Sequence, residues 1–367
     1  MIRLSLLFLV VGGLCVYARR DWFASLCGLV LLTTFTQHHD MPRMAMGVPG
    51  LNPWNVVLVA IILASLIQRS PQQPKAPAMV RGFLVAYVLL LIVGAIVAIL
   101  DVDILVERGI RLRTARDLTM DLILNPLKYI LVGVLIYSGA RSRRHMWMGL
   151  WTVVLSGALH ALMMYKTMKG MVFTGDYDDA RRMTDKMIGL HANDLAAVLS
   201  MTFWAAIVLA VALKGRWRWF CGAVVLLVLP AIVGCHSRTA YVALVVVALV
   251  LAVIRWRKLL LVGPLAVAMT VTVFPQIPAR LGMGFDTAAG GDAETDWNEV
   301  TAGRTFNLWA PTFEQIWNSP LVGHGRLAIA RTDCYEEILG REGSVASHPH
   351  NSYLEVLMDF GILGILI

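Results

Sequence analysis

The residues best suited to chemistry lie close to the C-terminal end of the sequence, in the segment Ser347-His348-Pro349-His350-Asn351-Ser352-Tyr353. Histidine is the side chain best matched to proton transfer near neutral pH. Glu355 and Asp359 follow at helical spacing, so both carboxylates lie on one face of a helix and either can hold a histidine ring. A His-X-His pair can instead chelate a metal, but no third ligand stands at a known spacing. We therefore predict a general base oriented by a carboxylate, and no metal site.

Two arginines occupy positions that are unfavourable for an arginine without a partner. Arg238 interrupts an apolar stretch from Trp219 to Ile254, and Cys235-His236-Ser237 leaves little room for a loop. We predict that it sits at a tight helical turn facing a wet, anionic or protein-lined cavity, or alternatively reaches lipid headgroups. Arg304 begins a predicted amphipathic helix over Thr305 to Trp317. A positive charge there favours a bound phosphate, or else a pairing with one of the nearby acids.

That amphipathic helix carries a row of large apolar residues at spacings of three and four, which we expect to pack on the membrane-facing core: Phe306, Trp309, Phe313 and Trp317. Further polar groups are candidates for substrate contact. His191 and Asn193 stand at the start of one apolar run, and Lys128 stands at the outer end of a short one. The arginines after the fourth run are offset by acids, so a solvated interfacial helix explains them best and phosphate binding is the alternative: Arg108, Arg111, Arg113 and Arg116.

The composition places all these residues in a membrane protein. Of the 367 residues, 58% are hydrophobic and only 15% are charged, with a mean hydropathy of +0.68. Such a chain has too little polar surface for a soluble, disordered, collagen-like or disulfide-framework protein. Ten runs without Asp, Glu, Lys or Arg are candidate spans: 4–18, 22–39, 44–68, 82–100, 129–140, 145–165, 195–213, 219–237, 239–254 and 259–279. An eleventh run begins near Tyr353, and we expect it to be incomplete at Ile367.

The basic residues indicate an orientation. Alternate connections between the runs hold fourteen Lys and Arg residues and a single acid, Asp21, which predicts that these connections face the cytoplasm. The stretch from Gln276 to His350 then lies outside, with five Arg against ten acids. The net charge of +8 is explained by this topology, so it does not indicate nucleic-acid binding. The sequence also has no phosphate-binding loop and no dinucleotide motif, so a reaction must draw on an activated substrate or a gradient.

These features predict an all-α polytopic membrane protein with about 11 or more transmembrane helices and one large, helix-containing outer loop. Residues 1–275 form a transmembrane bundle of about ten helices, residues 276–352 form the loop domain, and residues 353–367 begin a further transmembrane helix. No cofactor is expected.

Several segments together form a recognisable pattern: Gly189 to Leu195, Ser237-Arg238-Thr239-Ala240, Gly303-Arg304, Pro320 to Gly325, His348 to Leu354 and Gly361 to Gly364. They resemble the bacterial O-antigen ligase and polymerase superfamily over roughly the C-terminal half. The resemblance implies a GT-C-type glycosyltransferase of the inner membrane, multi-pass, without metal, nucleotide or nucleic acid, and with its active site facing the periplasm. Its partners would be membrane lipids, a glycan donor on undecaprenyl pyrophosphate and, for a ligase, a sugar hydroxyl of lipid A-core.

The candidate residues suit this inverting transfer. Arg238 and Arg304 can neutralise the pyrophosphate leaving group. His350 can take the acceptor proton, with Asp359 or Glu355 holding its ring. The substrate-binding candidates are His191, Asn193, Asn351, Lys128, Arg108, Arg111 and Arg116. An O-antigen polymerase or a protein O-oligosaccharyltransferase is the alternative within the enzyme class. A lipid-linked glycan flippase or other transporter is the alternative from another class, but transporters usually place ionisable groups at mid-membrane and repeat their halves.

Overall fold

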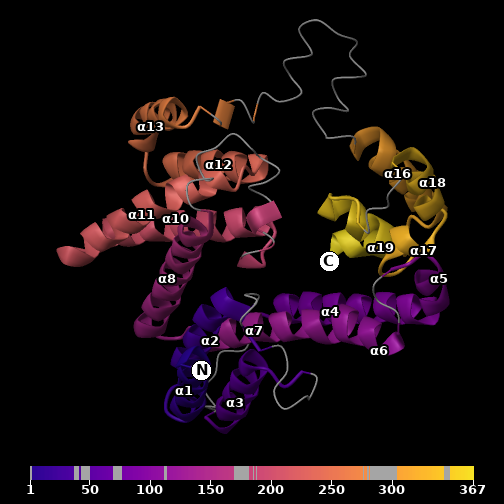
Figure 1. Ribbon diagram of the computed structural model, residues 1–367, viewed down its shortest axis with the longest axis horizontal. Helices are drawn as coiled ribbons and strands as arrows, with labels where there is room; N and C mark the ends of the chain where they lie inside the picture. Colours follow the sequence, from indigo (N-terminus) through magenta and orange to yellow (C-terminus); the bar gives the residue numbers. More distant parts are fainter. Residues whose placement is uncertain are drawn as a thin grey trace, which may run out of the picture. The chain divides into compact units, whose positions relative to one another are not determined.

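The structure is a computed structural model, and it describes residues 2–36, 41–42, 50–68, 77–110, 114–168, 182–184, 186, 188–275, 277–278, 281, 304–342 and 348–367. Over these residues every regular element is helical and no β-strand occurs (Figure 1). The predicted all-α fold is therefore confirmed. The chain divides into two compact units, residues 1–73 with 135–281 and residues 74–134 with 282–367, which are described separately.

Five helices among the described residues are long and apolar enough to cross a membrane: Ala78–Leu100, Ala115–Gly139, Arg143–Lys166, Ala192–Ala212 and Arg216–Gly234. Five more apolar helices are shorter: Leu4–Ala18, Trp22–Phe35, Pro53–Ile67, Arg238–Ile254 and Leu259–Val273. Each of the ten charge-free runs thus overlaps an apolar helix. This agreement is expected because a charged residue within lipid is costly.

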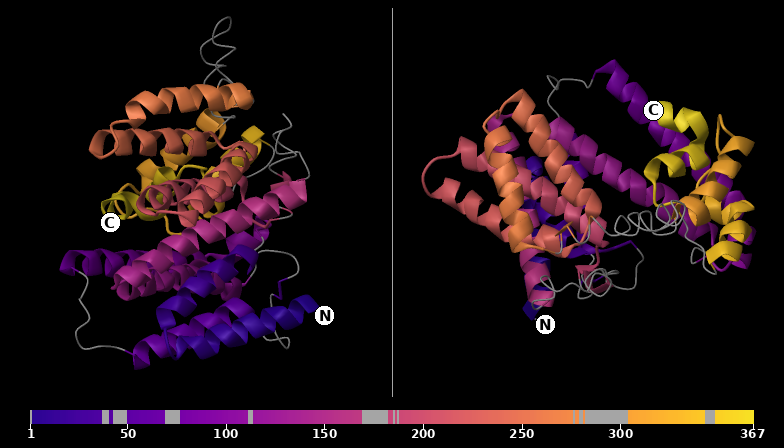
Figure 2. Two further views of the ribbon diagram at one scale, coloured as in Figure 1. Left: turned by 90° about the vertical axis from the view of Figure 1, so that its left-hand side faces the viewer. Right: turned by 90° about the horizontal axis from the view of Figure 1, so that it is seen from above.

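The first unit contains eight of these helices: α1 (Ile2–Ala18), α2 (Trp22–Thr36), α3 (Pro53–Ile67), α8 (Arg143–Met168), α10 (Ala192–Ala212), α11 (Arg216–Gly234), α12 (Arg238–Ile254) and α13 (Leu259–Val273). Its core joins α8, α10 and α11 through buried side chains such as Met164, Leu199 and Val228. The view from above shows α12 and α13 side by side (Figure 2).

Helices α8 and α10 approach each other closely at Gly157. The Thr202 hydroxyl donates to the Val198 carbonyl at 2.9 Å and to the Val153 carbonyl at 3.1 Å, so it bridges the two helices. A Cβ atom added to Gly157 would lie 1.8 Å from the Thr202 Oγ1 atom. Small residues that let helices approach closely are typical of membrane interfaces. The crossing therefore requires a glycine at this position.

We expect Gly157→Ala to lower the free energy of unfolding by about 2 kcal/mol, because the added methyl group overpacks the crossing. Thermal unfolding of the detergent-purified protein measures the loss. Gly149→Ala is the control: it lies on the same helix, and its Cβ would have no atom within 4 Å. Equal melting temperatures for the two variants would contradict this account of the α8–α10 contact.

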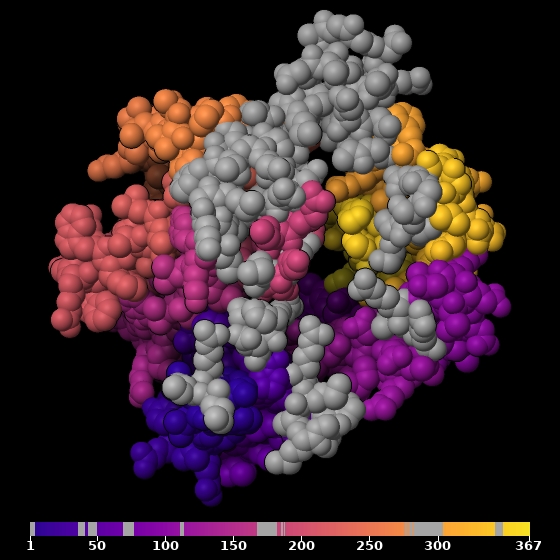
Figure 3. Space-filling view, viewed as in Figure 1, coloured from indigo at the N-terminus to yellow at the C-terminus, as the bar shows by residue number. Residues whose placement is uncertain are grey.

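The second unit contains α4 (Ala78–Leu100), α5 (Val102–Glu107), α6 (Ala115–Leu118), η1 (Thr119–Leu124), the first part of α7 (Asn125–Gly139), η4 (Thr305–Trp309), α16 (Ala310–Asn318), α17 (Ala328–Arg331), α18 (Cys334–Glu342) and α19 (Ser352–Leu366). Helix α4 contacts α6 and η1 along its side (Figure 1). The end of α5 and the region from α17 to α19 form a continuous surface in the space-filling view (Figure 3).

One predicted span is longer than the sequence suggested. Helices α6, η1 and α7 form a continuous helix from Ala115 to Gly139, so Lys128 lies near the middle of this helix and not at its end. The helix winds more widely as a π-helix over Thr119–Leu124, just before Pro126. Proline lacks an N–H and clashes with the preceding turn, and a π-turn accommodates both effects. The charge-free criterion missed this extension because it stopped at Lys128.

The helix predicted over 305–317 is present as η4 and α16, but a different face packs inside its unit. Leu308 and Ile316 are buried against α18 and α19, and the Thr312 side chain is buried between them. Phe306, Phe313 and Trp317 are exposed. Trp309 of the aromatic row packs against this core. For the other three residues the expected packing is wrong within this unit, where Leu308 and Ile316 form a second apolar row. In the same core, burial raises the pKa of Cys334 to about 11, so this thiol stays neutral.

Candidate active site

Arg238 is the first residue of α12, after a very short turn from α11, as the sequence predicted. His236 has a positive φ of 49°, and its N–H donates to the Val233 carbonyl at 3.0 Å. Ser237 caps α12, its hydroxyl accepting from the Ala240 N–H at 3.4 Å. The Tyr241 hydroxyl donates back to the Val233 carbonyl at 2.8 Å, which ties the two helices together. The turn thus presents Arg238 at the helix end whose dipole favours an anion.

The histidine segment is held in place by its neighbours. Pro349 is buried, and its carbonyl accepts from the Trp309 indole N–H at 2.9 Å. His348 and His350 are exposed on either side, with ring centroids 4.2 Å apart. His350 has a positive φ of 52°, a conformation that costs energy for a non-glycine residue. Such strain is typical of functional sites.

Arg304 and His350 lie on elements that contact each other within the second unit. Arg304 stands at the start of η4, as predicted, and is half-buried. Trp309 ends the same element and binds the segment that carries His350. Arg238 belongs to the first unit, so the convergence of all three side chains in one pocket stays a prediction.

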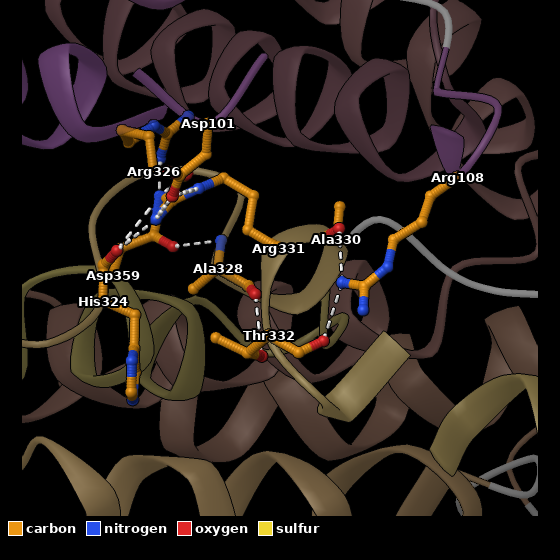
Figure 4. Close-up of polar contacts among 9 residues, drawn as sticks. All are labelled: Asp101, Arg108, His324, Arg326, Ala328, Ala330, Arg331, Thr332 and Asp359. Atoms are coloured by element: carbon orange, nitrogen blue, oxygen red, sulfur yellow. Dashed lines mark hydrogen bonds and ion pairs between the residues drawn. The ribbon is translucent and has the colours of Figure 1, made fainter. Parts of the chain in front are cut away.

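The carboxylates of Asp359 and Glu355 bind an arginine that the sequence analysis missed. Arg326 Nη1 lies 3.1 Å from Asp359 Oδ2 and 3.5 Å from Glu355 Oε1. The other Asp359 oxygen accepts from the Ala328 N–H at 3.3 Å. These contacts place Glu355 and Asp359 on the same face of α19, as expected. Their predicted role of holding the His350 ring stays a prediction. The contact that the structure gives both carboxylates is with Arg326, and Figure 4 shows that of Asp359.

Arg331 is a second arginine that the sequence analysis missed. Its side chain is 5% exposed, with Nη2 lying 2.9 Å from Asp101 Oδ2. Its Nη1 also donates to the carbonyls of His324 and Arg326 at 3.0 Å each. The close-up shows Arg331 between Asp101 and the loop that carries Arg326 (Figure 4). The sequence gives two signals for these ion pairs. Asp101 directly follows an apolar run, and Arg326 follows Gly323-His324-Gly325. Neither identifies its partner.

Arg108 binds the backbone at the end of α17. Its Nη1 donates to the carbonyls of Ala330 at 3.1 Å and Thr332 at 2.9 Å. Its guanidinium lies 4.8 Å from the centre of the Tyr335 ring, and the Tyr335 hydroxyl donates to the Arg108 carbonyl at 2.9 Å. The Arg108 Nε atom also lies 3.4 Å from the Glu336 Oε1 atom. The side chain is thus engaged in holding α17 and α18 (Figure 4).

We expect Arg108→Ala to lower the free energy of unfolding by about 2 kcal/mol, since two carbonyls lose a charged donor. The KM for a lipid-linked donor should stay unchanged. Arg116 of the same cluster is exposed in α6. The control is Arg257→Ala, an exposed arginine outside the cluster, which should alter neither quantity. A stable Arg108→Ala protein with weakened donor affinity would instead support the phosphate-binding interpretation of this arginine cluster.

The other substrate-binding candidates lie mostly at helix ends. His191 is the N-cap of α10, and its Nδ1 accepts from the Asn193 N–H at 3.3 Å. Asn351 is the N-cap of α19, and its side chain accepts from the N–H groups of Tyr353 at 3.0 Å and Leu354 at 3.4 Å. Arg111 falls outside the described residues. Among the described residues, no group of three or more His, Cys, Asp or Glu side chains is arranged to hold a metal ion.

Comparisons with known proteins bear on the C-terminal part of the chain. Residues 223–367 match a family model described as O-antigen ligase. No curated protein and no solved structure matches the chain. The matched part includes α12 and all the helices from η4 to α19, and it therefore covers Arg238, Arg304 and His350.

Proposed function

We propose, from the match of residues 223–367 to the O-antigen ligase family model, that the protein is an O-antigen ligase of lipopolysaccharide biosynthesis. It transfers a glycan from undecaprenyl pyrophosphate to a sugar hydroxyl of lipid A-core. The reaction is inverting and needs no metal. The observation that carries this proposal is that the family domain contains both helix-start arginines and the strained histidine, Arg238, Arg304 and His350.

The chemistry follows from these groups. The acceptor hydroxyl attacks the anomeric carbon of the donor sugar while its proton passes to His350, and the bond from that carbon to the pyrophosphate oxygen breaks. Undecaprenyl pyrophosphate leaves with an increased negative charge, which the guanidinium groups of Arg238 and Arg304 stabilise. Because the displacement takes place in one step, the configuration at the anomeric carbon inverts.

The proposed site faces the periplasm of the bacterial inner membrane. This orientation is supported by the basic residues, which gather in alternate connections between the apolar runs. With those connections in the cytoplasm, Arg238, Arg304 and His350 share the opposite side. Both proposed substrates are anchored in the membrane and would be presented at its periplasmic face. The donor is already activated by its pyrophosphate, so the reaction needs no nucleotide sugar.

Purified, reconstituted protein tests this function. It is given an undecaprenyl-pyrophosphate-linked glycan with lipid A-core, with a second lipid-linked glycan or with a pilin-like protein. Growth of lipid A-core supports the ligase, whereas growth of either other acceptor identifies a polymerase or a protein O-oligosaccharyltransferase. Movement of the donor across the bilayer without any transfer would identify a flippase. We expect EDTA to leave the rate unchanged, and a loss that a divalent ion restores would contradict the metal-free reaction.

A further inference from the structure

The segment from Gly323 to Arg326 packs tightly along the last turns of α4. The Arg326 N–H donates to the Gly94 carbonyl at 3.0 Å. A Cβ atom added to Gly94 would lie 2.6 Å from the Phe360 ring, and one added to Gly325 would lie 2.8 Å from Val97. Gly325 also has a positive φ of 81°. Glycines on both elements are therefore what permits this close approach.

This contact lies well inside the apolar length of α4. Gly94 precedes Leu100, the last residue of the helix, by six residues, which corresponds to about 9 Å along the axis. After Arg81, helix α4 carries no charged residue up to Leu100, and it is long and apolar enough to cross a membrane. Non-helical backbone at membrane depth is stable only where protein surrounds it or where it lines a water-filled cavity. The segment meets this condition, since the N–H groups of His324 and Gly325 donate to Met358 and Asp359 carbonyls at 2.8 Å.

For an α4 that crosses the membrane, the Arg326 backbone at Gly94 lies at a depth where charges are costly. The Asp359 side chain, its partner, is 5% exposed, while Glu355 is 36% exposed. Removing an ion pair from water often costs as much as the pairing returns, so an apolar pair of similar volume would be at least as stable. Ionisable residues at membrane depth therefore indicate a function.

We propose that Arg326 is a positioning residue of the glycan-transfer site, an inference that rests on the proposed function. Its guanidinium binds Glu355 and Asp359, one turn apart on α19, and so fixes how the first turns of α19 are rotated. Asn351 caps this helix and His350 directly precedes the cap. Any rotation of α19 therefore moves the His350 imidazole relative to the acceptor hydroxyl. A misplacement of about 1 Å can slow a reaction about 100-fold.

The test compares Arg326→Met and Arg326→Lys with the wild-type protein. We expect Arg326→Met to lower kcat about 100-fold with the donor KM changed less than about threefold, and Arg326→Lys to restore part of kcat. The control is Arg341→Met, which removes another arginine of the same unit that pairs with a glutamate four residues away, Glu337, and it should leave kcat unchanged. Wild-type kcat in the Arg326→Met protein would overturn the proposal.

A second variant separates positioning from folding. Arg326→Met combined with Asp359→Leu replaces the pair by apolar side chains and should recover the melting temperature while kcat stays low. Recovery of both would show that the pair only supports the fold, which overturns the proposal.

Hydrogen exchange gives a readout that needs no transfer assay. The N–H groups of Tyr353 and Leu354 donate hydrogen bonds to the Asn351 side chain. Their hydrogens should exchange faster in Arg326→Met than in the wild-type protein, and at an unchanged rate in Arg341→Met. If the wild-type protein transfers no glycan, the proposed function fails, whereas faster exchange in Arg326→Met would still show that Arg326 fixes the start of α19. Unchanged exchange in Arg326→Met would overturn the inference.

Discussion

Replacing His350 with asparagine is expected to lower glycan transfer by about 1,000-fold while donor binding stays intact, because the acceptor hydroxyl loses the group that takes its proton. Asparagine is chosen because His350 has a positive φ of 52°, a conformation that asparagine tolerates better than most residues. His350→Ala should lose the same activity and, in addition, some stability. The measurements are the initial rate with lipid A-core and the affinity for the lipid-linked donor.

The control for this prediction is the neighbouring histidine. The ring of His348 lies 4.2 Å from that of His350, and both are exposed, so His348→Asn tests whether any histidine in the segment suffices. We expect His348→Asn to retain most of the activity. Transfer by His350→Asn at a rate near that of the wild-type protein would refute the assignment of the base.

The helices and the turn at Arg238 are predictable from the sequence because both depend on local rules. A charge in lipid is costly whatever its partners, so charge-free runs predict helices. Arg238 stands only four residues after Gly234 at the end of one such helix, so a tight turn is the only arrangement that fits. Arg304 at the start of an amphipathic helix follows from the same kind of local pattern.

The pairing of Arg326 with Asp359 and of Arg331 with Asp101 is not predictable in this way. Asp101 and Arg331 are 230 residues apart in the sequence, and nothing local identifies one as the partner of the other. Lys128 shows the opposite problem, because a single lysine ended the predicted run although the helix continues past it from Ala115 to Gly139. The carboxylates of Glu355 and Asp359 are predictable as one helix face, whereas the arginine they bind depends on the tertiary fold.

Arg238→Ala is expected to weaken donor binding and also to slow the transfer of the glycan. We expect the affinity for the lipid-linked donor to fall about 10-fold and kcat to fall about 100-fold. In the proposed reaction the guanidinium binds the pyrophosphate in the ground state, and more strongly as charge develops on the leaving group. Arg238→Lys should be intermediate, since an ammonium keeps the charge but cannot bind two oxygens in a fork. Donor binding in detergent and single-turnover transfer measure the two effects separately.

The other end of the same helix provides the control. Arg255 is the C-cap of α12 and is exposed, and we expect Arg255→Ala to change neither donor affinity nor kcat. If Arg238 only reached lipid headgroups, the two alanine variants would behave alike, because both would lose one exposed contact with phosphate groups of the bilayer. A difference confined to Arg238→Ala, with equal melting temperatures for both proteins, therefore attributes the loss to the substrate and not to the anchoring of α12.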